Sequence, residues 1–161
     1  MRTLLRSVAA GLVASAALTA STTTQPPTAT AQSVSSMPST YESRVLRLLN
    51  HQRALRDIRS LRGSRCVDNY AESRARRLAV NDDLVHYGGL RNVLGSCGGS
   101  SVGEIVARGR GYADAAKVVR AWMRSPDHRQ VVLLKRFRQA GVGAYRSGDG
   151  TVYVSVIFRA P

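Results

Sequence analysis

The hydrophobic positions along this chain repeat with two spacings, one typical of helices and one typical of strands. In four segments the apolar residues return every three or four positions, which is the period of an amphipathic helix. This pattern predicts helices over 39–57, over 68–80, from about 112, and from Ser125 onward. The second of these helices has a predicted inner face of Ala71, Ala75, Leu78 and Ala79, and a predicted outer face of Glu72, Arg74, Arg76 and Arg77.

Polar residues mark where these helices are expected to begin. Ser39 and Glu42 have the spacing of a capping box, in which each side chain satisfies a free backbone N–H. Asp68 is a candidate cap for the second helix. Ser125 is followed by proline, which suits the first turn of a helix because its missing N–H costs nothing there. We therefore expect Ser125 to be an N-cap and His128 to be held in the turn that follows.

The strand pattern is clearest in the last part of the chain. Residues 141–146 and 151–158 are predicted strands, joined at 147–150 by a turn of Ser-Gly-Asp-Gly composition. Both alternating sets of residues in the second strand are largely apolar, so both faces are expected to be covered, as in a central strand. Residues 102–106 fit either a strand or a short helical turn, and 81–94 is predicted to be a loop with one weak turn. Helices above and below a hairpin predict an α+β sandwich.

The first thirty residues have the composition of a targeting segment. Arg2 and Arg6 flank a short apolar stretch over 8–18, and a Thr/Ser/Pro-rich tail follows it. This order of features is that of a secretory signal peptide, with cleavage expected after Ala31 or, alternatively, after Ala20. The apolar stretch is too short to span a bilayer, and no other stretch of the sequence qualifies as transmembrane. The sequence therefore predicts a secreted protein.

The remaining chain is the size of one domain. We expect a signal peptide over 1–31, a polar leader with no core of its own over 32–40, and a single domain over 41–161. Its two cysteines, Cys66 and Cys97, most simply form one disulfide in an exported protein, with two free buried thiols as the alternative. Neither cysteine lies in a Cys-x-x-Cys pair, which disfavours a zinc knuckle.

The charge balance is strongly basic. The formal net charge is +14, and removal of the two arginines in the signal segment leaves about +12. All of the basic residues except Lys117 and Lys135 are arginine. Such a chain is attracted to anionic surfaces such as envelope polymers and lipid head groups. The alternative interpretation is that the arginines, which are dispersed along the chain, only keep the domain soluble. Nucleic acid is disfavoured as a partner, because no aromatic residues interleave with the arginines as a stacking platform requires.

Candidate chemistry gathers in three short pieces. Residues 121–129, Ala-Trp-Met-Arg-Ser-Pro-Asp-His-Arg, present His128 next to a helix start. His86 lies in Val-His-Tyr and Glu104 in Gly-Glu-Ile. Trp122 has helical spacing to apolar neighbours and is expected in the core, and the third histidine, His51, is expected to be a partly exposed structural residue.

In this order, these pieces resemble the CAP superfamily, also called SCP-like extracellular domains, and in particular its short bacterial secreted members. The resemblance covers residues 41–159, nearly all of the predicted domain. The motifs that carry it are residues 48–53, 85–86, 102–104, 121–129, and 137–142 with the terminal hairpin.

The resemblance implies a three-layer α-β-α sandwich with a small antiparallel sheet and an open cleft. Carried over residue by residue, it assigns His86, His128 and Glu104 to the lining of the cleft. Many eukaryotic members have a second glutamate at the position that is Ser125 here. Bacterial members commonly have serine there too. Ile105 stands where asparagine is usual, which removes a polar group beside Glu104. The cleft lining is therefore His86, Glu104, Ser125 and His128.

His86, Glu104 and His128 together are compatible with four roles. Two imidazoles and one carboxylate form a plausible ligand set for zinc or another divalent cation. Alternatively, Glu104 orients one histidine by a hydrogen bond. In a hydrolase, one histidine would act as general base on a water. The fourth role is a buried polar network that only holds the loop 84–105 in place. Because Ser125 is expected to serve as a cap and the cysteines to be paired, the sequence offers no nucleophile, and a single carboxylate excludes a paired-carboxylate glycosidase.

Two functions follow from the sequence. The first is a non-enzymatic extracellular binding module for a lipid, an envelope polymer or a protein, with no required cofactor. The alternative is a metal-dependent or histidine-based hydrolase resembling a peptidase, in which His86, Glu104 and His128 are the candidate catalytic residues. We favour the first, because the site has polar groups but no evident nucleophile.

Overall fold

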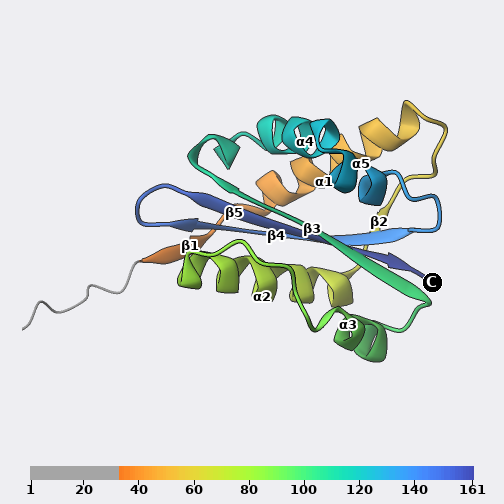
Figure 1. Ribbon diagram of the computed structural model, residues 1–161, viewed down its shortest axis with the longest axis horizontal. Coiled ribbons are helices and arrows are strands. Elements are labelled where there is room, and N and C mark those ends of the chain that lie inside the picture. Colours follow the sequence, from red (N-terminus) through yellow and green to blue (C-terminus); the bar gives the residue numbers. More distant parts are fainter. Residues whose placement is uncertain (1–32) are drawn as a thin grey trace, which may run out of the picture. The chain divides into compact units, whose positions relative to one another are not determined.

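A computed structural model describes residues 33–161, so the predicted signal peptide lies outside the described residues. Figure 1 shows the elements in chain order. They are β1 (Val34–Ser36), α1 (Ser39–Ala54), β2 (Arg62–Gly63), α2 (Arg65–Asn81), α3 (Leu90–Cys97), β3 (Ser101–Gly109), the 3-10 turn η1 (Arg110–Ala113), α4 (Ala115–Arg124), α5 (Pro126–Val132), β4 (Gln139–Ser147) and β5 (Val152–Ala160).

A single sheet forms the middle layer of residues 33–161. Its strand order is β1-β4-β5-β3, and the short β2 pairs with β4 as the one parallel neighbour. Helices α1, α4 and α5 cover one face of the sheet, and α2 with α3 covers the other (Figure 1). The three-layer α-β-α sandwich with a small, mainly antiparallel sheet is therefore confirmed. So is the central position of the strand predicted over 151–158, which pairs with β4 on one side and β3 on the other.

The core is divided by the sheet. On the face of α1 and α4 it holds large side chains, among them Leu49, Trp122 and Phe158, which are almost completely buried. On the other face, α2 lies directly against the backbone of β4. A Cβ atom at Gly141 would lie 2.4 Å from the backbone of Val67, so only glycine permits this close approach.

Three of the predicted helix starts differ in detail. Helix α1 begins at Ser39 itself, with Pro38 as N-cap, and no capping box forms. Helix α2 begins at Arg65, three residues before the predicted cap. Asp68 is instead turned toward the sheet, where its Oδ1 accepts the N–H of Val142 at 3.2 Å. Asp114 supplies the cap of α4 by accepting the N–H of Ala116 at 2.8 Å, so this helix begins later than the pattern predicted, after η1. Of these three starts, only that of α2 involves a contact with a neighbouring element, the bond between Asp68 and β4, whereas the cap of α4 is local.

Four segments differ from the prediction or resolve it. The segment 81–94 contains the start of a true helix, α3, in place of one weak turn. The ambiguous segment 102–106 is part of the nine-residue strand β3. Residues 34–36, which the sequence places in a polar leader, form β1 and pair with β4. Residues 62–63, predicted to be a connection, form β2.

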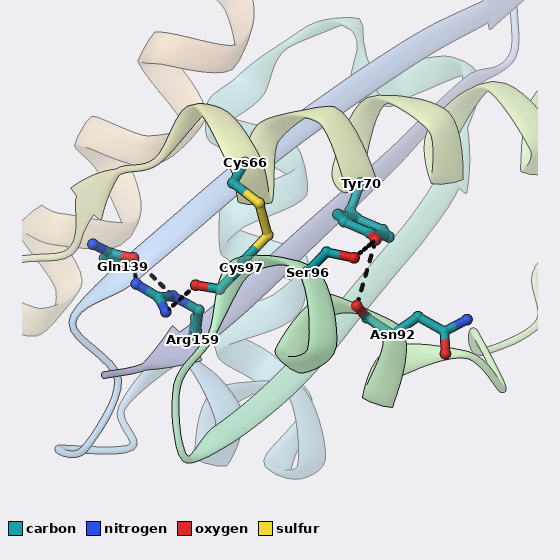
Figure 2. The surroundings of a disulfide bond; sticks show 7 residues. All are labelled: Cys66, Tyr70, Asn92, Ser96, Cys97, Gln139 and Arg159. Carbon is teal, nitrogen blue, oxygen red and sulfur yellow. Dashed lines mark hydrogen bonds between the residues drawn. A yellow bond between two sulfur atoms is a disulfide. The ribbon is translucent and has the colours of Figure 1, made fainter.

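The predicted disulfide is present between Cys66 and Cys97, with 5.8 Å between the Cα atoms. It ties the end of α3 to the start of α2, as Figure 2 shows. Beside it the Tyr70 hydroxyl lies 2.6 Å from Ser96 Oγ, and the guanidinium of Arg159 donates to the carbonyl of Cys97 at 2.6 Å. The alternative of free thiols is therefore excluded.

Candidate binding site

The site is organised around the carboxylate of Glu104, a buried residue on β3. Its Oε1 accepts a hydrogen bond from Arg74 Nε at 3.0 Å and lies 3.5 Å from Ser155 Oγ on β5. Its Oε2 accepts from the N–H of Tyr87 at 2.9 Å and lies 3.1 Å from His86 Nδ1. Both oxygens are therefore occupied by protein donors drawn from a helix, a loop and a neighbouring strand.

Arg74 is the functional residue that the sequence prediction missed. The prediction placed it on the outer, charged face of its helix, but its side chain is only 4% exposed and forms an ion pair with the equally buried Glu104. The same guanidinium also donates to the carbonyl of Val85 and lies over the ring of Tyr87, 5.7 Å from its centroid. The pattern held a signal for this, because position 74 lies three residues after Ala71 and four before Leu78, on the apolar stripe itself.

His86 is placed by this network and still faces solvent. Because Glu104 accepts from Arg74 and Tyr87, its oxygens act as acceptors, and His86 Nδ1 must carry the proton of their shared hydrogen bond. In the neutral imidazole the lone pair is then on Nε2. The side chain is 66% exposed, so this nitrogen is presented outward on a ring whose orientation is set from behind.

His128 lies in the first turn of α5, as predicted, but Ser125 plays a different part. Ser125 occupies the N-cap position, yet its hydroxyl makes no capping hydrogen bond. Ser125 Oγ instead lies 2.8 Å from His128 Nδ1. Burial, and then the nearby charge of His86, lower the pKa of His128 below its usual 6.5, so this imidazole is neutral at pH 7. Ser125 is therefore the N-cap residue, as predicted, but the prediction that its side chain is consumed as the cap was wrong.

The predicted metal ligands fit a cation only in part. Within residues 33–161 no group of three or more His, Cys, Asp and Glu side chains is gathered as a metal site would require. The carboxylate of Glu104 is saturated by protein donors, which suits a residue that orients His86 better than one that binds metal itself. The two imidazoles are the donors that remain available.

The other two singled-out residues are structural. Trp122 is buried, and its indole N–H donates to the carbonyl of Val106 at 3.1 Å, so it belongs to the core as predicted. His51 is exposed near the end of α1 and takes no part in the site. No helix within residues 33–161 combines the length and the apolar character needed to cross a membrane.

Comparisons with known proteins agree with this architecture. The chain is 30% identical over 128 residues to YkwD of Bacillus subtilis, which corresponds to 76% of this chain and 49% of that protein. The chain therefore spans about half the length of this curated relative.

Solved structures share the fold. An outer surface protein of Borrelia burgdorferi matches with a TM-score of 0.69 and 17% identity, over 78% of this chain and 97% of that one. An extracellular SCP-domain protein of Bacillus anthracis matches with a TM-score of 0.67 and 19% identity, over 76% of this chain and 41% of that one. The family model of the cysteine-rich secretory proteins matches residues 46–158. This chain therefore belongs to the cysteine-rich secretory protein (CAP) family.

Proposed function

We propose that this protein is secreted and acts as a non-enzymatic extracellular binding module. The composition of residues 1–31 supports export, and a disulfide is typical of exported proteins. Among the proteins of like fold, one is described as extracellular and another as an outer surface protein. The net charge of +14 supports an anionic partner, an envelope polymer or a lipid surface. The exposed side chain of His86 is accessible to a lipid or protein ligand.

The observation that carries a binding role is the saturation of Glu104. A general base needs a free lone pair directed at the proton that it removes. Both oxygens of Glu104 are instead engaged with Arg74, His86 and the Tyr87 N–H. The carboxylate therefore fixes the loop and the imidazole, and the site is a preorganised surface on which ligands are held.

A divalent cation such as zinc is the simplest ligand of that surface. The imidazoles of His86 and His128 would hold it, with Glu104 orienting the first of them. Calorimetric titration with zinc compares the wild type with His86→Ala, His128→Ala and, as a matched control, His51→Ala. We expect binding by the wild type and the control, and at least tenfold weaker binding by either site variant. Equal binding by all four proteins would refute a metal role for this pair.

A second candidate function, a histidine-based hydrolase, is favoured by one observation, the 2.8 Å contact between Ser125 Oγ and His128 Nδ1. His128 is neutral at pH 7 and so is able to accept the hydroxyl proton as Ser125 Oγ attacks a carbonyl carbon. A fluorophosphonate probe followed by peptide mass mapping tests this. Labelling of Ser125 that disappears in His128→Ala would support the hydrolase, and a peptide library left uncleaved by unlabelled protein would refute it.

A further inference from the structure

A basic pocket lies at the end of the sheet where β2 meets β4. Its volume is about 580 Å³, and it is lined by Arg59, Ser60, Arg62, Arg138, Gln139 and Pro161. The lining holds three arginines and no aspartate or glutamate side chain. Within residues 33–161 none of these three arginines forms an ion pair, although other arginines of the chain do. The side chains that line the pocket are therefore rich in positive charge.

The strand register concentrates hydrogen-bond donors in this pocket. Arg62 is the registered partner of Gln139, and Gln139 is the registered partner of Arg159, so the three residues form one row across neighbouring strands. Registered partners project to the same face of a sheet. Gln139 turns its carbonyl oxygen onto Arg159, whose Nε lies 2.8 Å away, as Figure 2 shows. The amide nitrogen of Gln139 is thereby left for the pocket. The side chains that line the pocket therefore offer mainly N–H donors.

The backbone beneath these side chains is fixed by the fold. The N–H of Arg62 donates to the carbonyl of Arg138 at 2.9 Å, and the N–H of Arg138 donates to the carbonyl of Arg159 at 3.0 Å. The fully buried Arg53 donates from its Nε to the carbonyl of Arg59 at 2.9 Å. Burial, and then the charge of Arg138, lower the pKa of Arg53.

We infer that this pocket binds a phosphate group. Arginine guanidinium groups match the oxygens of phosphate with paired N–H donors, and clusters of them are used for phosphate recognition. A volume of about 580 Å³ is within the range of ligand sites and exceeds what a bare anion needs, so a phosphate ester with a small organic body is the expected ligand. The site stands apart from His86 and does not depend on the function proposed above.

Titration by calorimetry and by NMR of the full domain tests this inference at constant ionic strength. The probes are inorganic phosphate, glycerol 3-phosphate and, as a carboxylate control, malonate. The variants are Arg62→Gln and Arg62→Gln/Arg138→Gln. The double variant Arg76→Gln/Arg91→Gln is the charge-matched control, because both of its arginines are exposed and neither lines the pocket. The side-chain amide resonances of Gln139 report binding locally.

We expect saturable binding of glycerol 3-phosphate that shifts the Gln139 amide signals, with inorganic phosphate binding more weakly. Arg62→Gln should weaken binding several-fold and the double pocket variant at least tenfold, while the charge-matched control changes it less than twofold. Stronger binding of inorganic phosphate than of the ester would support the phosphate site and assign it to the free anion. An equal loss in the pocket and control variants, equally tight binding of malonate, or no saturable binding would overturn the inference.

Discussion

The ion pair between Arg74 and Glu104 should be one of the most sensitive points of the fold. The two side chains are only 4% and 1% exposed, and their atoms approach to 3.0 Å. In Glu104→Gln the shape is kept but the charge is lost, and only one oxygen remains. That oxygen cannot accept from both Arg74 and the Tyr87 N–H, because in the wild type these donors bind different oxygens. The variant therefore leaves a buried guanidinium without a counter-charge, and one of the two donors, Arg74 Nε–H or the Tyr87 N–H, without an acceptor.

The size of the effect follows from this burial. Removing one partner of a buried ion pair typically costs about 3–5 kcal/mol, because the remaining charge is left without compensation. Total stabilities of domains are about 5–15 kcal/mol, so such a loss is a large fraction of the whole. Replacing both partners removes the uncompensated charge. Arg74→Met/Glu104→Gln should therefore be at least about 2 kcal/mol more stable than the sum of the two single changes predicts.

Urea unfolding at pH 7 with the disulfide intact measures the free energy of all four proteins. Amide hydrogen exchange at Tyr87 adds a local readout, because its N–H is protected by Glu104. We expect faster exchange there in Glu104→Gln even under conditions where the whole domain stays folded. Additive effects within about 0.5 kcal/mol would refute the assignment of Glu104 as the anchor of this loop.

Three further predictions concern the fold outside this site. Arg53 is fully buried and donates only to carbonyl oxygens. Changing it to methionine should lower the free energy of unfolding by about 3–5 kcal/mol, and a wild-type value in urea unfolding would contradict this. Burial and the neighbouring Glu72 raise the pKa of Glu42 from 4.5 to about 8, so the stability that its proton contributes is complete below pH 4.5 and lost as pH rises through 8. Glu42→Gln should therefore be more stable than wild type at pH 8.5, by about 1–2 kcal/mol after allowing for solvent screening, and equally stable near pH 4. A difference in the free energy of unfolding that stays constant between these pH values would contradict this titration. Changing Cys66 and Cys97 to serine should cost about 3–4 kcal/mol, since their separation of 31 residues sets the loop entropy, and an unchanged thermal midpoint would refute it.

Much of the fold could be predicted from local pattern. Helices α1 and α2 bury one face, and β5 buries both. Burial of a face requires apolar residues at regular spacing, so these elements can be recognised from the sequence pattern alone. The short elements could not be found in this way. The strand β2 has only two residues, and its existence depends on pairing with β4, far away in the sequence.

The candidate site divides in the same manner. The sequence selected His86, Glu104, Ser125 and His128, and the structure joins them as two separate pairs, His86 with Glu104 and Ser125 with His128. It also showed that Arg74 belongs with them. The charge on Arg74 favoured an exposed position, and only a partner thirty residues away on another element makes its burial favourable.

The sequence by itself predicted the class of fold, favoured a disulfide and, with the family resemblance, picked out four of the polar residues at the site. These depend on residue type and on local spacing, which are properties of the chain before it folds. The tertiary structure alone decided what those residues do. Whether Glu104 is a free base or an occupied anchor, whether Ser125 caps a helix or binds an imidazole, and whether Arg62 meets Gln139 all depend on distances between segments. Such distances are set by packing of the whole core, because each hydrogen bond forms only where burial brings its two partners together.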